Sequence, residues 1–286
     1  MDNITTSVHK VKKNDASPSS AMKRLHAESS HSLTQLCNYA DMSYWDSRYA
    51  GQDQDPFFEW YLKYSDLRFV FDDNIQSKDD SILVLGCGNS NLSFDFIQDG
   101  YSYITNIDFS RIVIYQMEQK YPEMTWTQMN AMYMSFPDKE YEVAVDKGTL
   151  DCIFCNHGVE YLFKDVRIYI NEVERILKDN GIWIVISHNS PEVLLKFFEN
   201  DDTEDDNFMS FDLINVYLLY PDYEFDTDFS DSNNDHNGYY VYVCKKSLEK
   251  SEVKDKLLKE KEKICDRDVW KSSTKGKKIP KTEKIQ

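Results

Sequence analysis

Short apolar runs alternate with amphipathic stretches through the middle of the chain, and this alternation predicts a parallel sheet. Five runs of four or five residues are typical of buried strands: Ser81–Leu85, Tyr103–Ile107, Met124–Gln128, Glu142–Val145 and Ile182–Ile186. Apolar residues spaced by three and four positions predict helices between them at Leu92–Gln98, Arg111–Lys120 and Tyr161–Lys178. Asn180 and Gly181 should end the last of these helices. Strands that alternate with helices form β-α units, so we expect parallel pairing with helices on both faces of the sheet.

Two further strands, Phe211–Leu219 and Tyr239–Lys245, are predicted beyond this region. The stretch between them is rich in Asp and Asn and leaves little room for a helical crossover, so these two strands should pair antiparallel. The predicted fold class is therefore α/β, with a seven-stranded, mostly parallel sheet that contains one antiparallel strand. Upstream, aromatic and aliphatic residues recur at helical spacing from Tyr44 to Phe71, which predicts a helical lead-in.

Composition divides the chain of 286 residues into three parts. Residues 1–40 carry too few apolar groups to offset the entropy of ordering, so we expect a disordered N-terminal segment. Residues 41–246 should form one domain with an acidic insertion at 199–235, and residues 247–286 a basic, Lys-rich tail. From Lys245 onward there are 15 lysines and arginines against 8 acidic residues, and before it 18 against 42. An acidic body repels phosphate backbones, so we expect a basic protein partner and no direct nucleic-acid binding.

Two features of the chain bear on its compartment and on metal binding. It has no run of eighteen apolar residues, and its first twenty residues lack the apolar centre of a secretion signal, so we expect neither a membrane span nor export. Six scattered cysteines are typical of reduced thiols in a cytoplasmic protein. Cys152 and Cys155 form a C-x-x-C with His157 close behind, but no second such pair exists, so we expect free thiols and no metal site. The acidic insertion is interpreted either as a solvated loop or as a docking surface.

A glycine turn follows the first buried strand, at the edge where open α/β sheets bind ligands. Gly86 and Gly88 let the main chain approach a ligand closely, but Asn91 stands where a dinucleotide-binding fingerprint has its third glycine. Asp108 ends the next predicted strand, where a carboxylate can accept both hydroxyls of a ribose; serving only as a helix N-cap is its alternative role. This edge therefore suits a nucleoside-containing cofactor.

Three segments together resemble class I S-adenosylmethionine-dependent methyltransferases, and within them the group that methylates lysines of elongation factor 1-alpha. They are Tyr44–Tyr49 (YWDSRY), Val84–Ser90 (VLGCGNS) and Asp146–Asp151 (DKGTLD). The likeness covers about residues 40–190. It implies a Rossmann-like fold, S-adenosyl-L-methionine as cofactor, and a lysine of elongation factor 1-alpha as methyl acceptor.

The resemblance also implies which residues contact the cofactor: Trp45, Tyr49, Trp60, Gly86, Gly88, Asp108, Phe109, Asn130, Ala131 and Lys147. The two glycines would meet its methionine part, Asp108 its ribose, and Phe109, Asn130 and Ala131 its adenine. The family commonly has Asp where this chain has Asn130; the amide loses the charge but keeps a carbonyl that can accept a bond from the adenine amino group. Packing between helix and sheet is the alternative role for the three large aromatic residues.

Methyl transfer from a sulfonium to an amine requires alignment, exclusion of water and a neutral amine. Asp146, Lys147 and Asp151 are the catalytic candidates: either carboxylate can orient the amine or take its proton through water, and Lys147 can line the acceptor channel. An exposed structural lysine is the alternative for Lys147. His188, just past the fifth strand, is interpreted as a polar strand-end residue. A small-molecule methyltransferase and a catalytically weak binding module remain as alternative functions.

Overall fold

The computed structural model describes residues 39–51, 58–155, 159–198, 211–221 and 238–247. Nearly all of the predicted disordered N-terminal segment, most of the acidic insertion and nearly all of the basic tail lie outside these residues. The fold described below is that of the remaining chain, which includes every residue expected to bind a cofactor or take part in catalysis.

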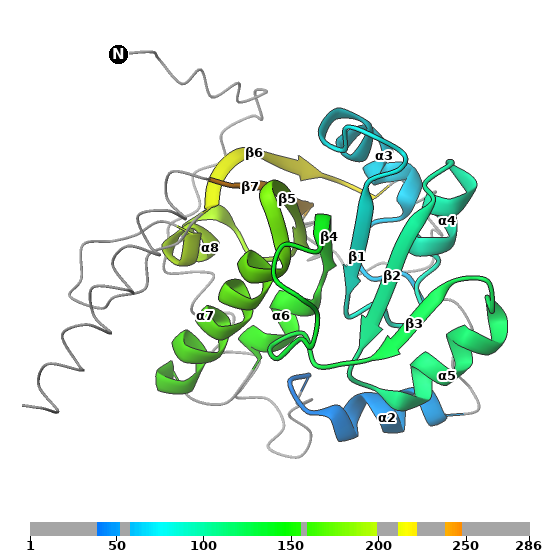
Figure 1. The fold of residues 1–286 in the computed structure, drawn as a ribbon. Helices are drawn as coiled ribbons and strands as arrows, with labels where there is room; N and C mark the ends of the chain where they lie inside the picture. The colour runs from blue at the N-terminus through cyan, green and yellow to red at the C-terminus, as the bar shows by residue number, and fades with distance from the viewer. Residues whose placement is uncertain (1–38, 52–57, 156–158, 199–210, 222–237, 248–286) are drawn as a thin grey trace, which may run out of the picture.

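A seven-stranded sheet forms the centre of the structure, with strand order β3-β2-β1-β4-β5-β7-β6 (Figure 1). Its strands are β1 (Ser81–Leu85), β2 (Tyr103–Asp108), β3 (Thr125–Gln128), β4 (Tyr141–Lys147), β5 (Leu177–Ser187), β6 (Phe211–Leu219) and β7 (Tyr239–Lys246). Strands β1 to β5 pair in parallel, and β7 runs antiparallel to both β5 and β6. The predicted fold class, with its single antiparallel strand, is confirmed.

Helices cover both faces of the sheet (Figure 1). They are α2 (Met42–Ala50), α3 (Tyr64–Asn74), α4 (Leu92–Gln98), α5 (Arg111–Lys120), α6 (Thr149–Phe154), α7 (Val159–Ile176) and α8 (Pro191–Phe198). Leu83 and Leu85 of β1 share one core with α7 and α8, and Ile82 and Val84 share the other with α3 and α4. This alternation follows from the two-residue period of a strand. None of the helices in the described residues is long and apolar enough to cross a membrane.

The predicted helical lead-in is wrong in its middle part, because residues 58–63 do not form a helix. The carbonyl of Trp60 accepts hydrogen bonds from the Leu62 N–H at 2.9 Å and from Lys147 Nζ at 3.0 Å, so this backbone is bonded to the sheet edge. Tyr61 has a φ angle of 67°, which a helix does not allow. We call residues 58–61 the connecting segment below.

The predicted end of α7 is also wrong. The helix ends at Ile176, and Leu177 already pairs with Tyr141 of β4. Asn180, with a φ angle of 65°, lies where the register between β4 and β5 shifts instead of capping the helix. Tertiary pairing of the buried Leu177 with the sheet has overridden the local turn signal.

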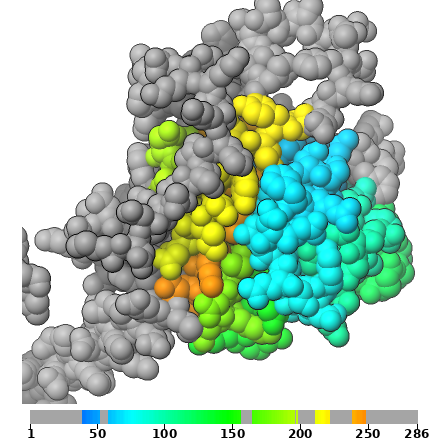
Figure 2. All heavy atoms as spheres, turned by 90° about the horizontal axis from the view of Figure 1, so that it is seen from above, coloured from blue at the N-terminus to red at the C-terminus, as the bar shows by residue number. Residues whose placement is uncertain are grey.

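Strand β6 forms one edge of the sheet and lies beside α3. Figure 2 shows the atoms of β6 at the surface next to those of the α3 region. The rings of Phe69 and Tyr217 meet there edge to face, with 5.7 Å between their centroids. The opposite edge is β3. The carboxyl ends of the parallel strands β1 to β4 lie along one side of the sheet, where a ligand could bind.

Candidate active site

A cavity of about 850 Å³ lies at the carboxyl ends of β1, β2 and β4. Its walls also include part of α2, the connecting segment and His188. All ten residues predicted to contact a cofactor line this cavity, and so does Asp151. Cavities of this volume bind small molecules in many proteins.

The glycine turn after β1 has a backbone that suits glycine. Gly86 and Gly88 have φ angles of 61° and 52°, in the left-handed region. A Cβ atom on Gly88 would lie 2.9 Å from the hydroxyl oxygen of Tyr49, and one on Gly86 would lie 2.1 Å from Thr149 Oγ1. The turn therefore packs against α2 on one side and α6 on the other, with its main chain in the cavity wall.

Replacing Gly86 by alanine is expected to lower the free energy of unfolding by about 1–3 kcal/mol more than the same change at Gly100, because of overpacking against Thr149. Gly100 is a matched control, since its φ angle is 93° but a Cβ atom there would meet nothing within 4 Å. Urea denaturation of the two variants gives the comparison. Equal destabilisation would show that the contact with Thr149 relaxes without cost.

The carboxylate of Asp108 is held rigidly at the end of β2. The N–H of Gly88 donates to its Oδ2 at 3.0 Å, and the N–H of Ser110 donates to its Oδ1 at 2.9 Å. The side chain is buried, which raises the pKa of the carboxyl to about 6 although both N–H groups favour the charged form. Ser110, with its hydroxyl near the N–H of Val113, is the N-cap of α5. The alternative role of Asp108 as that N-cap is therefore wrong.

Large aromatic rings form part of the cavity wall. Trp45 and Tyr49 stack with 5.8 Å between ring centroids, and Trp60 meets Trp45 at 6.0 Å. Trp45 and Tyr49 are buried against α5, so these two residues both pack against a helix and line the cavity. The guanidinium of Arg48 lies 5.0 Å from the ring centroid of Phe58. This contact links α2 to the connecting segment.

Asp146, the first residue of the DKGTLD motif, lies beneath the cavity instead of lining it. Its carboxylate accepts the N–H groups of Thr149 at 2.8 Å and Leu150 at 3.0 Å, and the hydroxyl of Tyr169 at 2.6 Å. Complete burial raises the pKa of this carboxyl to about 7. This geometry is that of a side chain that caps α6, which does not favour direct contact with a substrate.

Lys147 holds the connecting segment. Its Nζ donates to Glu59 Oε2 at 2.7 Å and to the Trp60 carbonyl at 3.0 Å. Its side chain is 5% exposed, so the alternative of an exposed structural lysine is wrong. Burial lowers the pKa of the Lys147 ammonium, and the Glu59 carboxylate opposes that shift. Glu59 also accepts the hydroxyl of Ser90 and the N–H of Asn91, which ties the segment to the glycine turn.

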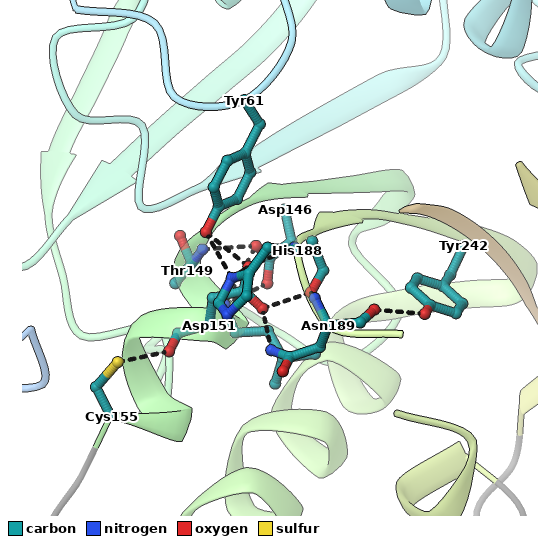
Figure 3. Close-up of polar contacts among 10 residues, drawn as sticks. Tyr61, Asp146, Thr149, Asp151, Cys155, His188, Asn189 and Tyr242 are labelled. Atoms are coloured by element: carbon teal, nitrogen blue, oxygen red, sulfur yellow. Dashed lines mark hydrogen bonds and ion pairs between the residues drawn. The ribbon is translucent and has the colours of Figure 1, made fainter. Parts of the chain in front are cut away.

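Tyr61, Asp151 and His188 come together at the β4 side of the cavity (Figure 3). The Tyr61 hydroxyl donates to Asp151 Oδ2 at 2.7 Å, and His188 Nδ1 lies 2.9 Å from the same oxygen. Burial alone would raise the pKa of Asp151, but the hydrogen bond and charge of His188, with the hydroxyls of Ser187 and Tyr61, hold it below its ordinary value. Asp151 is therefore an ionised carboxylate surrounded by donors.

Sequence reasoning missed Tyr61 and Glu59 as site residues. The helical spacing from Tyr44 to Phe71 places Tyr61 in an apolar stripe, and none of the three motifs includes Glu59. The glycine of the DKGTLD motif is one residue that points to Tyr61. Gly148 has a φ angle of 87°, and a Cβ atom there would lie 3.2 Å from the Tyr61 ring. A glycine at that place makes room for a neighbour, although the sequence does not name it.

The cysteines in the described part of the chain are free thiols: Cys87, Cys152, Cys155 and Cys244. Burial raises the pKa of each of them. Within the described residues, no group of three or more His, Cys, Asp or Glu side chains has the arrangement needed to hold a metal ion.

A family model described as "Methyltransferase domain" matches residues 83–185, which run from β1 into β5. The matched segment is a methyltransferase domain. The glycine turn and the fixed carboxylate of Asp108 lie within the matched residues. The residues present fit S-adenosylmethionine as cofactor: close main chain at Gly86 and Gly88 and a carboxylate for the ribose.

Two curated relatives and one solved structure resemble this methyltransferase domain. EEF1A lysine methyltransferase 4 from Bos taurus is 31% identical over 163 residues, which are 54% of this chain and 64% of that protein. The eEF1A lysine and N-terminal methyltransferase from Homo sapiens is 35% identical over 162 residues, 55% of this chain and 23% of that protein. The chain thus spans less than two thirds of the length of either relative.

The solved structure is N-methyltransferase NodS from Bradyrhizobium japonicum WM9 in complex with S-adenosyl-L-homocysteine. It aligns with a TM-score of 0.50 and 11% identity, over 73% of this chain and 98% of that one. A likeness at this identity shows the fold alone.

Proposed function

We propose that this protein transfers a methyl group from S-adenosylmethionine to a lysine side chain of a protein, elongation factor 1-alpha. The observation that carries the proposal is one cavity that holds two kinds of site. Asp108, fixed by two N–H groups, lies beside the glycine turn, and Tyr61, Asp151 and His188 lie at the β4 side. The relatives named for lysine methylation of eEF1A support the choice of acceptor.

The predicted cofactor residues divide along the cofactor according to the elements that carry them. Asp108 would accept the ribose hydroxyls, and Gly86 and Gly88 would admit the methionine part. Phe109, Asn130 and Ala131 at the ends of β2 and β3 would surround the adenine, while Trp45, Tyr49 and Trp60 would cover the methionine end. Asn130 Oδ1 already accepts the N–H of Met132 at 2.9 Å, so its adenine contact would use the remaining acceptor capacity.

The protein contributes to catalysis by aligning the reactants, excluding water and favouring positive charge in the cavity. Bound S-adenosylmethionine supplies an electrophilic methyl group. The aromatic rings of α2 and the connecting segment exclude water and favour cations on their faces. Lys147 keeps Trp60 at this wall through the Trp60 carbonyl, so we assign it a positioning role. The strongly acidic body of the chain also suits a basic protein substrate.

The test is to incubate the purified protein with elongation factor 1-alpha and a labelled methyl donor, and to locate the label by mass spectrometry. We expect methylated lysine in the factor, and none with an Asp108→Ala variant as control. In a parallel incubation with a cell extract, label found only in the small-molecule fraction would overturn the proposal that the acceptor is a protein. Binding of S-adenosylhomocysteine without transfer to any acceptor would favour a binding module that retains the fold.

The affinity for S-adenosylhomocysteine should fall as the pH drops below about 6. Because the pKa of Asp108 in the folded protein is about 6, its carboxylate is progressively protonated there and loses its acceptor strength toward ribose hydroxyls. The expected slope is up to about tenfold in Kd per pH unit. Calorimetric titrations between pH 5 and pH 8, in steps of about half a pH unit, measure this change in Kd. An Asp108→Asn variant should bind more weakly and lose this dependence.

Asp108 should have the opposite effect on the stability of the unliganded protein. Its pKa is raised from 3.8 to about 6 by folding, so the native state binds more protons than the unfolded state between these values. The free energy of unfolding contributed by this group therefore decreases as pH rises from about 4 to about 6. A denaturation series that shows the reverse trend for wild type relative to Asp108→Asn would contradict the assigned pKa.

A further inference from the structure

We propose that the hydroxyl oxygen of Tyr61 receives the acceptor amine, and that Asp151 and His188 hold this oxygen in position. The inference rests on the proposed methyl transfer and identifies the part of the cavity that takes the lysine side chain. It makes Tyr61 the residue that touches the substrate and the other two positioning residues.

The hydrogen bonds around Asp151 explain why Tyr61, and not the carboxylate, would face the amine. Asp151 Oδ1 accepts the hydroxyl of Ser187 and the side-chain amide of Asn189, the latter at 2.8 Å. Its Oδ2 accepts the Tyr61 hydroxyl at 2.7 Å and the main-chain N–H of His188 at 3.1 Å, and lies 2.9 Å from His188 Nδ1. A carboxylate with this many donors, 3% exposed, has little capacity left for a substrate.

The Tyr61 oxygen, in contrast, has acceptor capacity toward the cavity. Its proton is directed to Asp151, and a hydroxyl oxygen that donates keeps lone pairs that can accept. Burial and the neighbouring Asp151 charge raise the pKa of Tyr61 well above its ordinary value, so it stays a neutral hydroxyl and orients the amine without acting as a base. His188 Nδ1, 3.1 Å from the same oxygen, limits its movement on the remaining side.

The backbone of Tyr61 is held in an uncommon conformation by its surroundings. Its φ angle of 67° is rare for a bulky residue, and such strain persists mainly where the structure enforces it, often at functional sites. Gly148 leaves room for its ring, and Tyr239 of β7 stacks on it with 4.7 Å between centroids. Lys147 fixes the preceding residue, Trp60. Independent elements thus converge on the placement of one hydroxyl group.

The chemistry of the step suits this arrangement. The lysine ammonium gives one proton to water, and an N–H of the neutral amine donates to Tyr61 Oη, which aims the nitrogen lone pair. The nitrogen then forms a bond to the methyl carbon while the carbon–sulfur bond breaks and its electron pair stays on sulfur. Positive charge moves from sulfur to nitrogen while the amine stays hydrogen-bonded to the Tyr61 oxygen, which Asp151 holds in place.

Tyr61→Phe tests the role of the hydroxyl alone, and Tyr115→Phe is the control because Tyr115 is an exposed tyrosine of α5 outside the cavity lining. With elongation factor 1-alpha as substrate, we expect Tyr61→Phe to lower kcat about 10- to 100-fold, the effect of losing one hydrogen bond to an amine that becomes charged as it is methylated. Affinity for S-adenosylhomocysteine should stay within about twofold in both variants, since neither change removes a proposed cofactor contact. Tyr115→Phe should keep kcat within about threefold.

A second measurement is independent of the identity of the protein acceptor. The probe is n-butylamine, which has the chain length and charge of a lysine side chain, titrated into the protein with and without S-adenosylhomocysteine and followed by nuclear magnetic resonance. We expect binding that n-butanol does not reproduce and that Tyr61→Phe and Asp151→Asn each weaken about tenfold or more. The positioning role of Asp151 predicts that Asp151→Asn has a much smaller further effect on kcat when Tyr61 is already Phe.

The outcomes separate this inference from the function on which it rests. Wild-type protein that binds n-butylamine in this pattern but leaves elongation factor 1-alpha unmodified would overturn the acceptor and support the amine site. If Tyr61→Phe methylates the factor with the kcat of wild type and binds n-butylamine with unchanged affinity, the proposed amine site is wrong, while the proposed function stands. Additive effects of Tyr61→Phe and Asp151→Asn would remove Asp151 as the residue that positions Tyr61.

Discussion

Replacing Asp108 by alanine should lower the affinity for S-adenosylhomocysteine by about two to four orders of magnitude. The variant loses two charge-assisted hydrogen bonds to the ribose, each worth about 1.5–3 kcal/mol. It also leaves the N–H groups of Gly88 and Ser110 without the acceptor that now fixes the turn. Isothermal titration calorimetry measures the change in Kd, and circular dichroism checks that the variant is folded.

Asp138→Ala is the control for this experiment, because Asp138 is an exposed carboxylate outside the cavity lining and pairs with Arg175. We expect its Kd for S-adenosylhomocysteine to equal that of wild type. A folded Asp108→Ala protein with a Kd within threefold of wild type, a difference of about 0.7 kcal/mol, would refute the ribose site.

Glu59→Gln should lower the free energy of unfolding by about 3–5 kcal/mol, the usual effect of removing one partner from a buried ion pair. The change leaves the Lys147 ammonium, 5% exposed, without the carboxylate that now lies 2.7 Å away. The double variant Glu59→Gln with Lys147→Met removes both charges and should recover most of the lost stability. Urea denaturation of the single and double variants measures this recovery.

An exposed ion pair provides the comparison for Glu59. Lys139 and Asp179 lie 2.8 Å apart with side chains 53% and 36% exposed, so Asp179→Asn should cost less than about 1 kcal/mol. A Glu59→Gln variant as stable as Asp179→Asn would show that the connecting segment is held by its aromatic contacts and not by Lys147.

Local periodicity predicted the sheet, and the family resemblance supplied the predicted cofactor residues. The bounds of β1, β6, α4 and α5 agree with the prediction because each element is a short, strongly patterned run between clear turn signals. All ten predicted cofactor residues line one cavity, because the carboxyl ends of neighbouring parallel strands necessarily share one edge of a sheet. Whether each of them contacts S-adenosylmethionine stays a prediction.

The other half of the site depends on contacts between distant parts of the chain. Tyr61 and Asp151 are separated by 90 residues, and Glu59 and Lys147 by 88, so no window of local sequence contains either pair. The burial of Lys147 also depends on a distant contact, because a lysine is expected to be exposed unless its partner Glu59 is known. Motif resemblance selected Lys147 and Asp151 correctly as cavity residues, but their partners required the three-dimensional structure.

The order of residues in the connecting segment links the two halves of the cavity. Trp60 lies at the wall that would cover the methionine end, and Tyr61, the next residue, points to Asp151 and His188. A ligand that immobilises this dipeptide from one half reduces the conformational entropy left to lose when the other half fills. Donor and acceptor should therefore bind with positive heterotropic cooperativity, and thermodynamic linkage requires each to tighten the other by the same factor.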